Sequence, residues 1–292
     1  MNQTPQPGIL ADIPAQARYI NFQIAQADDL PRALRALRDA VDGEAVVAGL
    51  GLSVCEALGR ELPGLTAGPV VPGSLVDLPC QPVALWLWLR GEDRGELLHR
   101  ERQLVHLLAP AFEREHSVEA FRHDTGRDLT GYEDGTENPK GDDAVAAAIV
   151  AEGPLAGSSF VGVQQWLHDF DAFERMPGSE QDDSFGRRRS DNEELEDAPE
   201  SAHVKRTAQE DFDPEAFILR RGMPWIAGNR GGQMFAAFGR SLYAFEIQLV
   251  RMSGAEDGIV DALFRFTRPL NGAYAWCPAL RDGRLDLSPL GL

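Results

Sequence analysis

The chain has 292 residues, of which 43% are apolar and 25% charged, the balance of a globular protein with a sizeable core. Its formal net charge of −18 repels nucleic acid and anionic lipid, so we exclude both as partners. The longest apolar runs, such as residues 83–89, are too short to span a bilayer, which argues against a membrane protein.

The cysteines and the first residues indicate a reducing compartment. Cys55, Cys80 and Cys277 are scattered and form no CxxC pair, so a zinc ribbon or a thioredoxin-type site has no support. An odd, sparse cysteine count fits a reducing environment. The N-terminal stretch has no cationic region followed by an apolar one, as a signal peptide would. We therefore expect a cytoplasmic protein.

The first 125 residues predict one complete structural unit. Residues 1–16, rich in proline and glutamine, predict a loose arm. Apolar residues at helical spacing predict a helix over 30–41, with Asp28 or Asp29 as its cap and Gly43 at its end. The other expected elements are strands at 17–26, 45–50, 83–89 and 118–121 and a helix at 95–112. Strand, helix, strand, strand, helix, strand is the order of a ferredoxin-like unit.

The second half repeats this order of elements without repeating the letters. The expected elements are strands at 159–167, 217–220, 233–238 and 272–277 and helices at 169–176 and 240–252. We predict an α+β fold of two ferredoxin-like (βαββαβ) halves, with antiparallel sheets and helices packed outside them. The predicted domains are residues 1–125 and residues 126–292.

Two segments interrupt the regular pattern. Residues 125–144 are dense in Gly, Asp, Asn and Pro, and residues 177–202 form a long, charged stretch. Loops of that length inside a compact chain are usually functional or disordered. Both segments lie next to the residues that carry candidate chemistry.

Several familiar motifs are absent. GLGLSV at 49–54 lacks the third glycine of a dinucleotide fingerprint, and GNRGG at 228–232 lacks the Lys-Ser/Thr of a phosphate loop. No GxSxG hydrolase elbow occurs. The six histidines form no HExxH and no pair at i, i+4, so a zinc site is not expected.

Three short strings stand out together: GYEDGTENP at 131–139, AHVKR at 202–206 and ILRRGMP at 218–224. Taken singly, the first could be only a tight turn, because Asp-Gly and Asn-Pro are turn dipeptides. A lone His203 could be an ordinary surface or core histidine. Arg220, next to Arg221, could lie on the solvated edge of a strand. Only the combination indicates a site.

In this order and spacing, the three strings resemble the dye-decolorising peroxidases, in particular the compact bacterial B-type members. QQWLHD at 164–169, FGRRR at 185–189 and the segment 235–252 also match, so the resemblance covers most of residues 125–280. It implies one haem b per chain, held in the C-terminal half, with His203 as the axial iron ligand. It places Asp134 and Arg220 on the peroxide side, as catalytic and haem-contacting residues.

Further haem contacts are implied at Gly135, Thr136 and Glu137, beside Asp134. Arg187 matches an arginine that the family uses near the haem propionates, and a guanidinium suits a propionate. The alternative for Arg187 is that it only offsets the acidic loop around it. The implied partners are hydrogen peroxide and small phenolic or aromatic donors, and we expect a homo-oligomer.

Elementary chemistry agrees with these roles. A single imidazole leaves the sixth iron position open. Cleaving the O–O bond requires a proton to move from one oxygen to the other, which a carboxylate such as Asp134 can accept and return. The guanidinium of Arg220 stabilises negative charge and keeps its proton. Arg220 should lower the pKa of Asp134 and burial should raise it. We expect an acidic activity optimum.

Other positions leave alternatives open. Gly222 stands where relatives commonly carry Asn or Ser, which puts the positioning of peroxide in question. Asp261 is the candidate for an acid behind His203, with Arg265 as the other occupant of that place. A set of aromatic residues could relay electrons from bulky donors or be plain core: Trp166, Trp225, Tyr243, Tyr274 and Trp276.

Two other functions share part of this pattern. A protein that stores or delivers haem, or strips its iron, needs His203 but neither Asp134 nor Arg220. A cofactor-free ferredoxin-like binding module needs none of the three.

Overall fold

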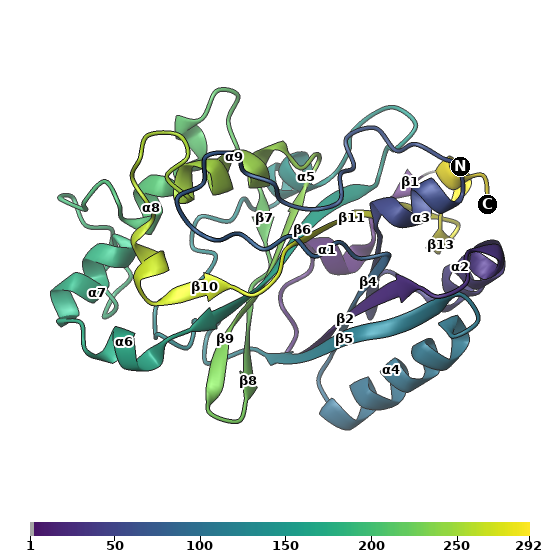
Figure 1. Ribbon diagram of the computed structural model, residues 1–292, viewed down its shortest axis with the longest axis horizontal. Coiled ribbons are helices and arrows are strands. Elements are labelled where there is room, and N and C mark those ends of the chain that lie inside the picture. Colours follow the sequence, from purple (N-terminus) through teal and green to yellow (C-terminus); the bar gives the residue numbers. More distant parts are fainter. Residues whose placement is uncertain (1–2) are drawn as a thin grey trace.

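The computed structural model describes residues 3–292. In the N-terminal half, four antiparallel strands carry two helices on one face (Figure 1). The strands are β2 (Gln16–Ile24), β3 (Val46–Leu50), β4 (Leu85–Gly91) and β5 (Phe112–Phe121); the helices are α2 (Leu30–Ala40) and α4 (Arg94–Leu108). The strand order β3-β4-β2-β5 is that of the ferredoxin-like unit. All six predicted elements of this half are present. The predicted helix over 95–112 ends at Leu108, however, and the strand predicted at 118–121 already begins at Phe112.

The C-terminal half repeats the arrangement. Its strands are β6 (Ser159–His168), β8 (Met223–Ala227), β9 (Arg230–Gly239) and β11 (Ala273–Cys277), and α9 (Tyr243–Met252) follows β9. The pairings give the order β8-β9-β6-β11, so the predicted pair of ferredoxin-like halves is confirmed. The second strand of this unit is β8. The expected strand at 217–220 is reduced to β7 (Leu219–Arg220).

The two sheets meet edge to edge. Trp276 of β11 pairs with Leu50 of β3, and Ala120 of β5 pairs with Trp225 of β8. These pairs close the eight strands into a ring. Because both halves contribute strands to one ring, the division of the chain at residue 125 stays a prediction.

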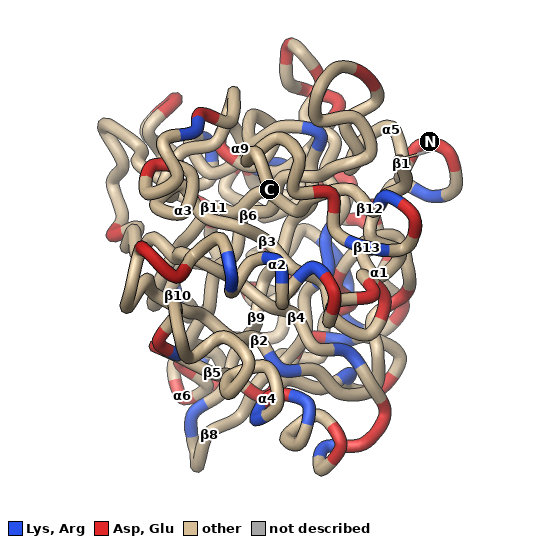
Figure 2. Tube along the Cα trace, turned by 90° about the vertical axis from the view of Figure 1, so that its right-hand side faces the viewer, with Lys and Arg blue, Asp and Glu red and all other residues tan. Residues whose placement is uncertain are grey.

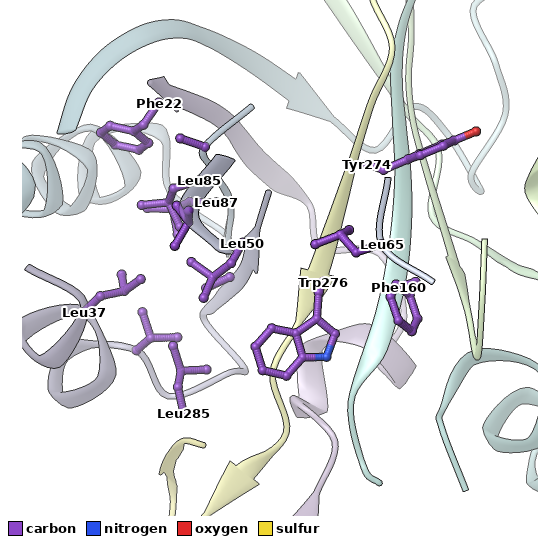
Figure 3. Packing of buried hydrophobic residues seen from close by; sticks show 14 of the residues in the cluster. Phe22, Leu37, Leu50, Leu65, Leu85, Leu87, Phe160, Tyr274, Trp276 and Leu285 are labelled. Carbon is purple, nitrogen blue, oxygen red and sulfur yellow. The ribbon is translucent and has the colours of Figure 1, made fainter. Parts of the chain in front are cut away.

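Alternate side chains of the strands fill two different cores. In β4, Trp86 and Trp88 point into the ring, and the neighbouring leucines point to the helices outside. Trp276 packs in the outer core, where its strand neighbours are Leu50 and Phe160 from the two halves (Figure 3). The outer core is therefore continuous across the junction.

The N-terminal segment is not a loose arm over residues 3–16. Ile9 and Gln6 are buried, and the Gln6 amide bonds to the backbone of Ala48 and Pro278. The strand β1 (Gln3–Thr4) pairs with β12 (Leu280–Arg281), so residues 3–4 lie beside the C-terminal part of the chain (Figure 1). These are tertiary contacts that residue composition does not reveal. Residues 1–2 lie outside the described part.

Shorter elements complete the chain. They are α1 (Pro7–Leu10), α3 (Leu52–Ala57), α5 (Asp142–Ala148), α6 (Phe170–Glu174), α7 (Gly178–Phe185), α8 (His203–Arg206), β10 (Thr267–Pro269) and β13 (Arg284–Leu285), with 3-10 turns at 27–29, 209–211, 262–265 and 288–290. The prediction of one long loop over 177–202 is thus wrong where α7 lies. Asp29 occupies the N-cap of α2, but its side chain makes no capping bond, because its backbone continues the preceding 3-10 turn.

Acidic residues occupy many loops around the outside of the molecule, interspersed with Lys and Arg (Figure 2). The three cysteines are free thiols. Within the described residues, no helix has the length and apolar character needed to cross a membrane.

Candidate active site

A cavity lies between the C-terminal sheet and the segments that cover its outer face. Together with its open mouth it encloses about 980 Å³ that protein atoms do not fill. Its walls are mostly apolar and include the aromatic residues Trp166 of β6, Phe235 of β9, Phe245 of α9 and Phe266, which precedes β10. The cavity also contains Asp134, His203 and Arg220, so the structure brings together the three residues that the strings predict.

The loop at 131–139 delivers Asp134 to the cavity. Gly131 and Gly135 have φ of 90° and 75°, a left-handed backbone that favours glycine, and they turn the loop on either side of Asp134. The Asp134 Oδ2 atom accepts a hydrogen bond of 2.6 Å from Gln233 Nε2. Burial raises the pKa of the Asp134 carboxyl group above its ordinary value, and the Arg220 guanidinium opposes that rise.

Asn138 ties this loop to the strand that carries Arg220. The Arg220 backbone N–H donates to Asn138 Oδ1 at 2.8 Å, and Asn138 Nδ2 donates to the Arg220 carbonyl oxygen at 2.9 Å. Two reciprocal bonds fix the loop on β7 and so place Asp134 and Arg220 on one cavity. Burial lowers the pKa of the Arg220 guanidinium from its usual range.

Arg221 points to the other side of β7, as strand alternation predicts. It is not solvated there, however. Arg221 is 8% exposed and donates to the Leu10 carbonyl oxygen at 2.9 Å, against the N-terminal segment.

His203 is the first residue of α8 and has a buried acid behind it. Its Nδ1 atom lies 2.7 Å from Asp261 Oδ2, and Asp261 is 1% exposed. The other Asp261 oxygen accepts from the Leu263 backbone at 2.9 Å. This pair fixes the ring and leaves Nε2 for the cavity. The choice of Asp261 is confirmed; Arg265 instead pairs with Glu180 at the surface.

Gly135, Thr136, Glu137 and Arg187 are not among the residues that line the cavity. Arg187 donates to Glu137 Oε1 at 2.5 Å and to Glu194 Oε2 at 3.1 Å. The structure therefore shows Arg187 offsetting acidic groups, and any contact of these four residues with a cofactor stays a prediction.

Sequence reasoning missed several polar residues of the cavity, three of which lie on β6 and β9. Gln164 and His168 alternate with Trp166 on one face of β6, a spacing that the period of two could have revealed. The His168 ring bonds to Thr267 at 2.7 Å and to Asp128 at 2.9 Å. Gln233 on β9 is the third, and its bond to Asp134 has no signal in the sequence.

Four of the five candidate electron-relay residues are buried, which favours the core alternative. Trp166, Trp225, Tyr274 and Trp276 are 8%, 4%, 1% and 1% exposed. Tyr243 is partly exposed, and its hydroxyl donates to the Pro214 carbonyl oxygen at 3.0 Å. Surface radical sites on the four buried residues are not supported.

Comparison with known proteins agrees with this geometry. A dye-decolorizing peroxidase of Mycolicibacterium paratuberculosis is 32% identical over 210 residues, covering 69% of this chain and 59% of that relative. A dye-decolorizing protein from V. cholerae superposes with a TM-score of 0.85 at 28% identity, covering 95% of this chain and 97% of that one. A variant of DypB from Rhodococcus jostii, solved in complex with haem, gives 0.83 at 25% identity and covers 94% and 96%.

The matched stretch spans about three fifths of the mycobacterial relative, whereas the structural match takes in nearly all of the V. cholerae chain. The family model for the C-terminal part of Dyp-type peroxidases matches residues 125–282, which is more than half of the chain. The match includes all three of the short strings that contain Asp134, His203 and Arg220. This chain belongs to the Dyp-type peroxidase family.

Proposed function

We propose that this chain is a haem b peroxidase that uses hydrogen peroxide to oxidise phenolic or other aromatic donors. One observation carries the proposal: His203, fixed through Nδ1 by buried Asp261, lines the same cavity as Asp134 and Arg220. Family membership and the haem complex of the DypB variant support the same assignment.

The cavity suits a flat, apolar cofactor with polar edges. Three buried polar atoms of its lining have no partner among residues 3–292: Gln164 Nε2, Arg220 Nε and Gln233 Oε1. Buried polar atoms are normally paired, so a bound group, peroxide or water should complete them. No group of three or more His, Cys, Asp or Glu within the described residues could hold a bare metal ion. A porphyrin with one imidazole ligand needs no such group.

His203 Nε2 is the atom that would hold the haem iron, and the bound haem would supply the activation of peroxide. Asp261 keeps the His203 ring oriented and accepts the Nδ1 hydrogen, which makes Nε2 a stronger donor to metal. The apolar walls exclude water from the site, so charges inside act more strongly.

Asp134 moves the proton in this proposal. Its carboxylate accepts the proton from one peroxide oxygen and returns it to the other, which leaves as water. Arg220 stabilises the negative charge that develops during cleavage and cannot act as a competing base. Since burial raises the pKa of Asp134, the active carboxylate is lost on acidification at a higher pH than for a free carboxyl group.

Two variants distinguish this function from haem handling. We expect Asp134→Asn and Arg220→Leu to take up haem normally and to oxidise a phenolic donor at least 100-fold more slowly with peroxide. Haem uptake with unchanged turnover would contradict the peroxidase proposal and favour a haem-handling protein.

We also propose that the chain forms a homo-oligomer. Light scattering after size-exclusion chromatography tests this, and a measured mass of one chain would contradict it.

A further inference from the structure

We propose that Gln233 is a positioning residue that fixes the Asp134 carboxyl group in the cavity, in space that is open only because residue 222 is glycine. The inference rests on the proposed function of Asp134. It concerns a residue of β9 that none of the three strings contains.

The space beside Gly222 is already filled. A Cβ atom built on Gly222 would lie 2.1 Å from Asp134 Oδ2 and 2.4 Å from Gln233 Nε2, the two atoms of the 2.6 Å hydrogen bond. Both distances are far below van der Waals contact. Any side chain at position 222 would therefore displace the carboxyl group, the amide or both. The backbone of Gly222 is not in the left-handed region, so this position requires glycine for its missing side chain and not for its backbone conformation.

Gln233 is a buried strand residue in the wall of the cavity. It is 8% exposed and lies in β9, opposite Pro224 of β8 in the strand register. Its Nε2 atom donates to Asp134, while its Oε1 atom is buried and has no partner among the described residues. Such an unpaired acceptor, on a residue that lines the cavity, is placed to receive a hydrogen from peroxide or water.

The bond also acts on the charge of Asp134. Donation from Gln233 stabilises the carboxylate and lowers the pKa of Asp134, against the larger effect of burial. The charged and titratable groups that act on Asp134 come from several elements: Arg220 of β7, Asp128 with its partner His168, His203 of α8 and Tyr19 of β2. Gln233 is the only one of its described neighbours that donates a hydrogen bond directly to its carboxylate.

Two substitutions disrupt the bond, one in β9 and one in the link between β7 and β8. Gln233→Leu removes the donor at similar volume, and Gly222→Ala inserts a methyl group between the two partners. The matched control is Gly178→Ala, because no atom lies within 4 Å of a Cβ there. Near-ultraviolet circular dichroism establishes that each variant is folded, so a folding failure of one leaves the other as the test.

The measurement is an infrared titration of the carboxyl band of Asp134, identified by its absence in Asp134→Asn. We expect both variants to raise the midpoint by about one to two pH units, as loss of a charge-assisted bond implies, and the control to leave it unchanged. In the haem-loaded chain, the pH at which kcat/KM for peroxide falls on acidification should rise by the same interval.

Unchanged infrared midpoints in both folded variants would overturn the inference. Because that titration needs neither haem nor turnover, it separates the two proposals. If the chain has no peroxidase activity but the variants still shift the infrared midpoint, the proposed function is wrong and the positioning role of Gln233 still holds.

Discussion

Arg206 clamps the single helical turn that begins with His203. Arg206 Nη1 and Nη2 donate to the two oxygens of Asp257 at 2.8 and 2.7 Å, and Nη2 also donates to the Arg251 carbonyl oxygen at 2.8 Å. The α8 helix has only four residues, too few to be stable alone. We therefore predict that Arg206→Met destabilises the fold and loosens the His203 ring.

The size of the effect follows from the contacts. The Arg206 side chain is 4% exposed and that of Asp257 is 38% exposed, so the carboxylate regains water when its partner is removed. A backbone hydrogen bond contributes about 1 kcal/mol, and a pair with a partly exposed carboxylate about 1–2 kcal/mol. Arg206 Nε is buried and unpaired among the described residues, and its removal offsets part of the loss. We expect a net loss of about 2 kcal/mol.

Urea unfolding monitored by tryptophan fluorescence measures this loss. Arg265→Met is the matched control, because Arg265 pairs with Glu180 at the surface with 52% and 46% exposure. Its expected loss is below about 1 kcal/mol. Equal losses in the two variants would refute the clamp.

The pH dependence gives a second check. The Arg206 guanidinium holds the pKa of Asp257 below its usual 3.8. A depressed acid stabilises the fold above its unfolded pKa and loses that contribution as the pH falls through the folded pKa. The difference between wild type and Arg206→Met should therefore shrink as the pH is lowered below about 4.

Three further predictions follow from the site. Asp134→Asn should lower kcat/KM for peroxide by about 10²–10⁴ while the haem spectrum stays intact. In the wild type, kcat/KM should fall as the pH is lowered through the pKa of Asp134, which lies above its ordinary value of 3.8. A fall in kcat/KM that is centred at or below pH 3.8 would contradict the role of burial. Asp261→Asn should weaken haem binding or turnover about 10- to 100-fold in a haem titration, and an unchanged affinity and rate would contradict its support of His203. Gly186→Ala should cost about 1–3 kcal/mol in urea unfolding, because Gly186 has φ of 80° and a Cβ there would lie 2.3 Å from Val204 Cγ2; an unchanged midpoint would contradict this.

Most of the fold follows from local patterns in the sequence. The strands of the N-terminal half alternate or are continuously apolar, and their helices carry apolar residues at helical spacing. In the C-terminal half, β8 escaped prediction because it contains Pro224, a residue that usually argues against a strand. The helix α7 escaped because its sequence, GSEQDDSF, is polar and is typical of a loop.

Some residues of the site could likewise be predicted from the sequence, and others could not. Asp134, His203 and Arg220 lie in compact strings, and the cavity brings them together as the resemblance implies. Gln233 could not be found, because its bond to Asp134 depends on a space that opens only when β8 and β9 pair. The contact between Arg187 and Glu137 likewise depends on how two loops meet.

The most direct test of the account is a haem titration of the wild type and of His203→Ala, followed by optical absorbance with and without peroxide. We expect the wild type to bind one haem per chain with a Soret band that responds to peroxide, and folded His203→Ala to lose the axial-ligand spectrum and that response. Identical spectra and peroxide responses in the two proteins would contradict it.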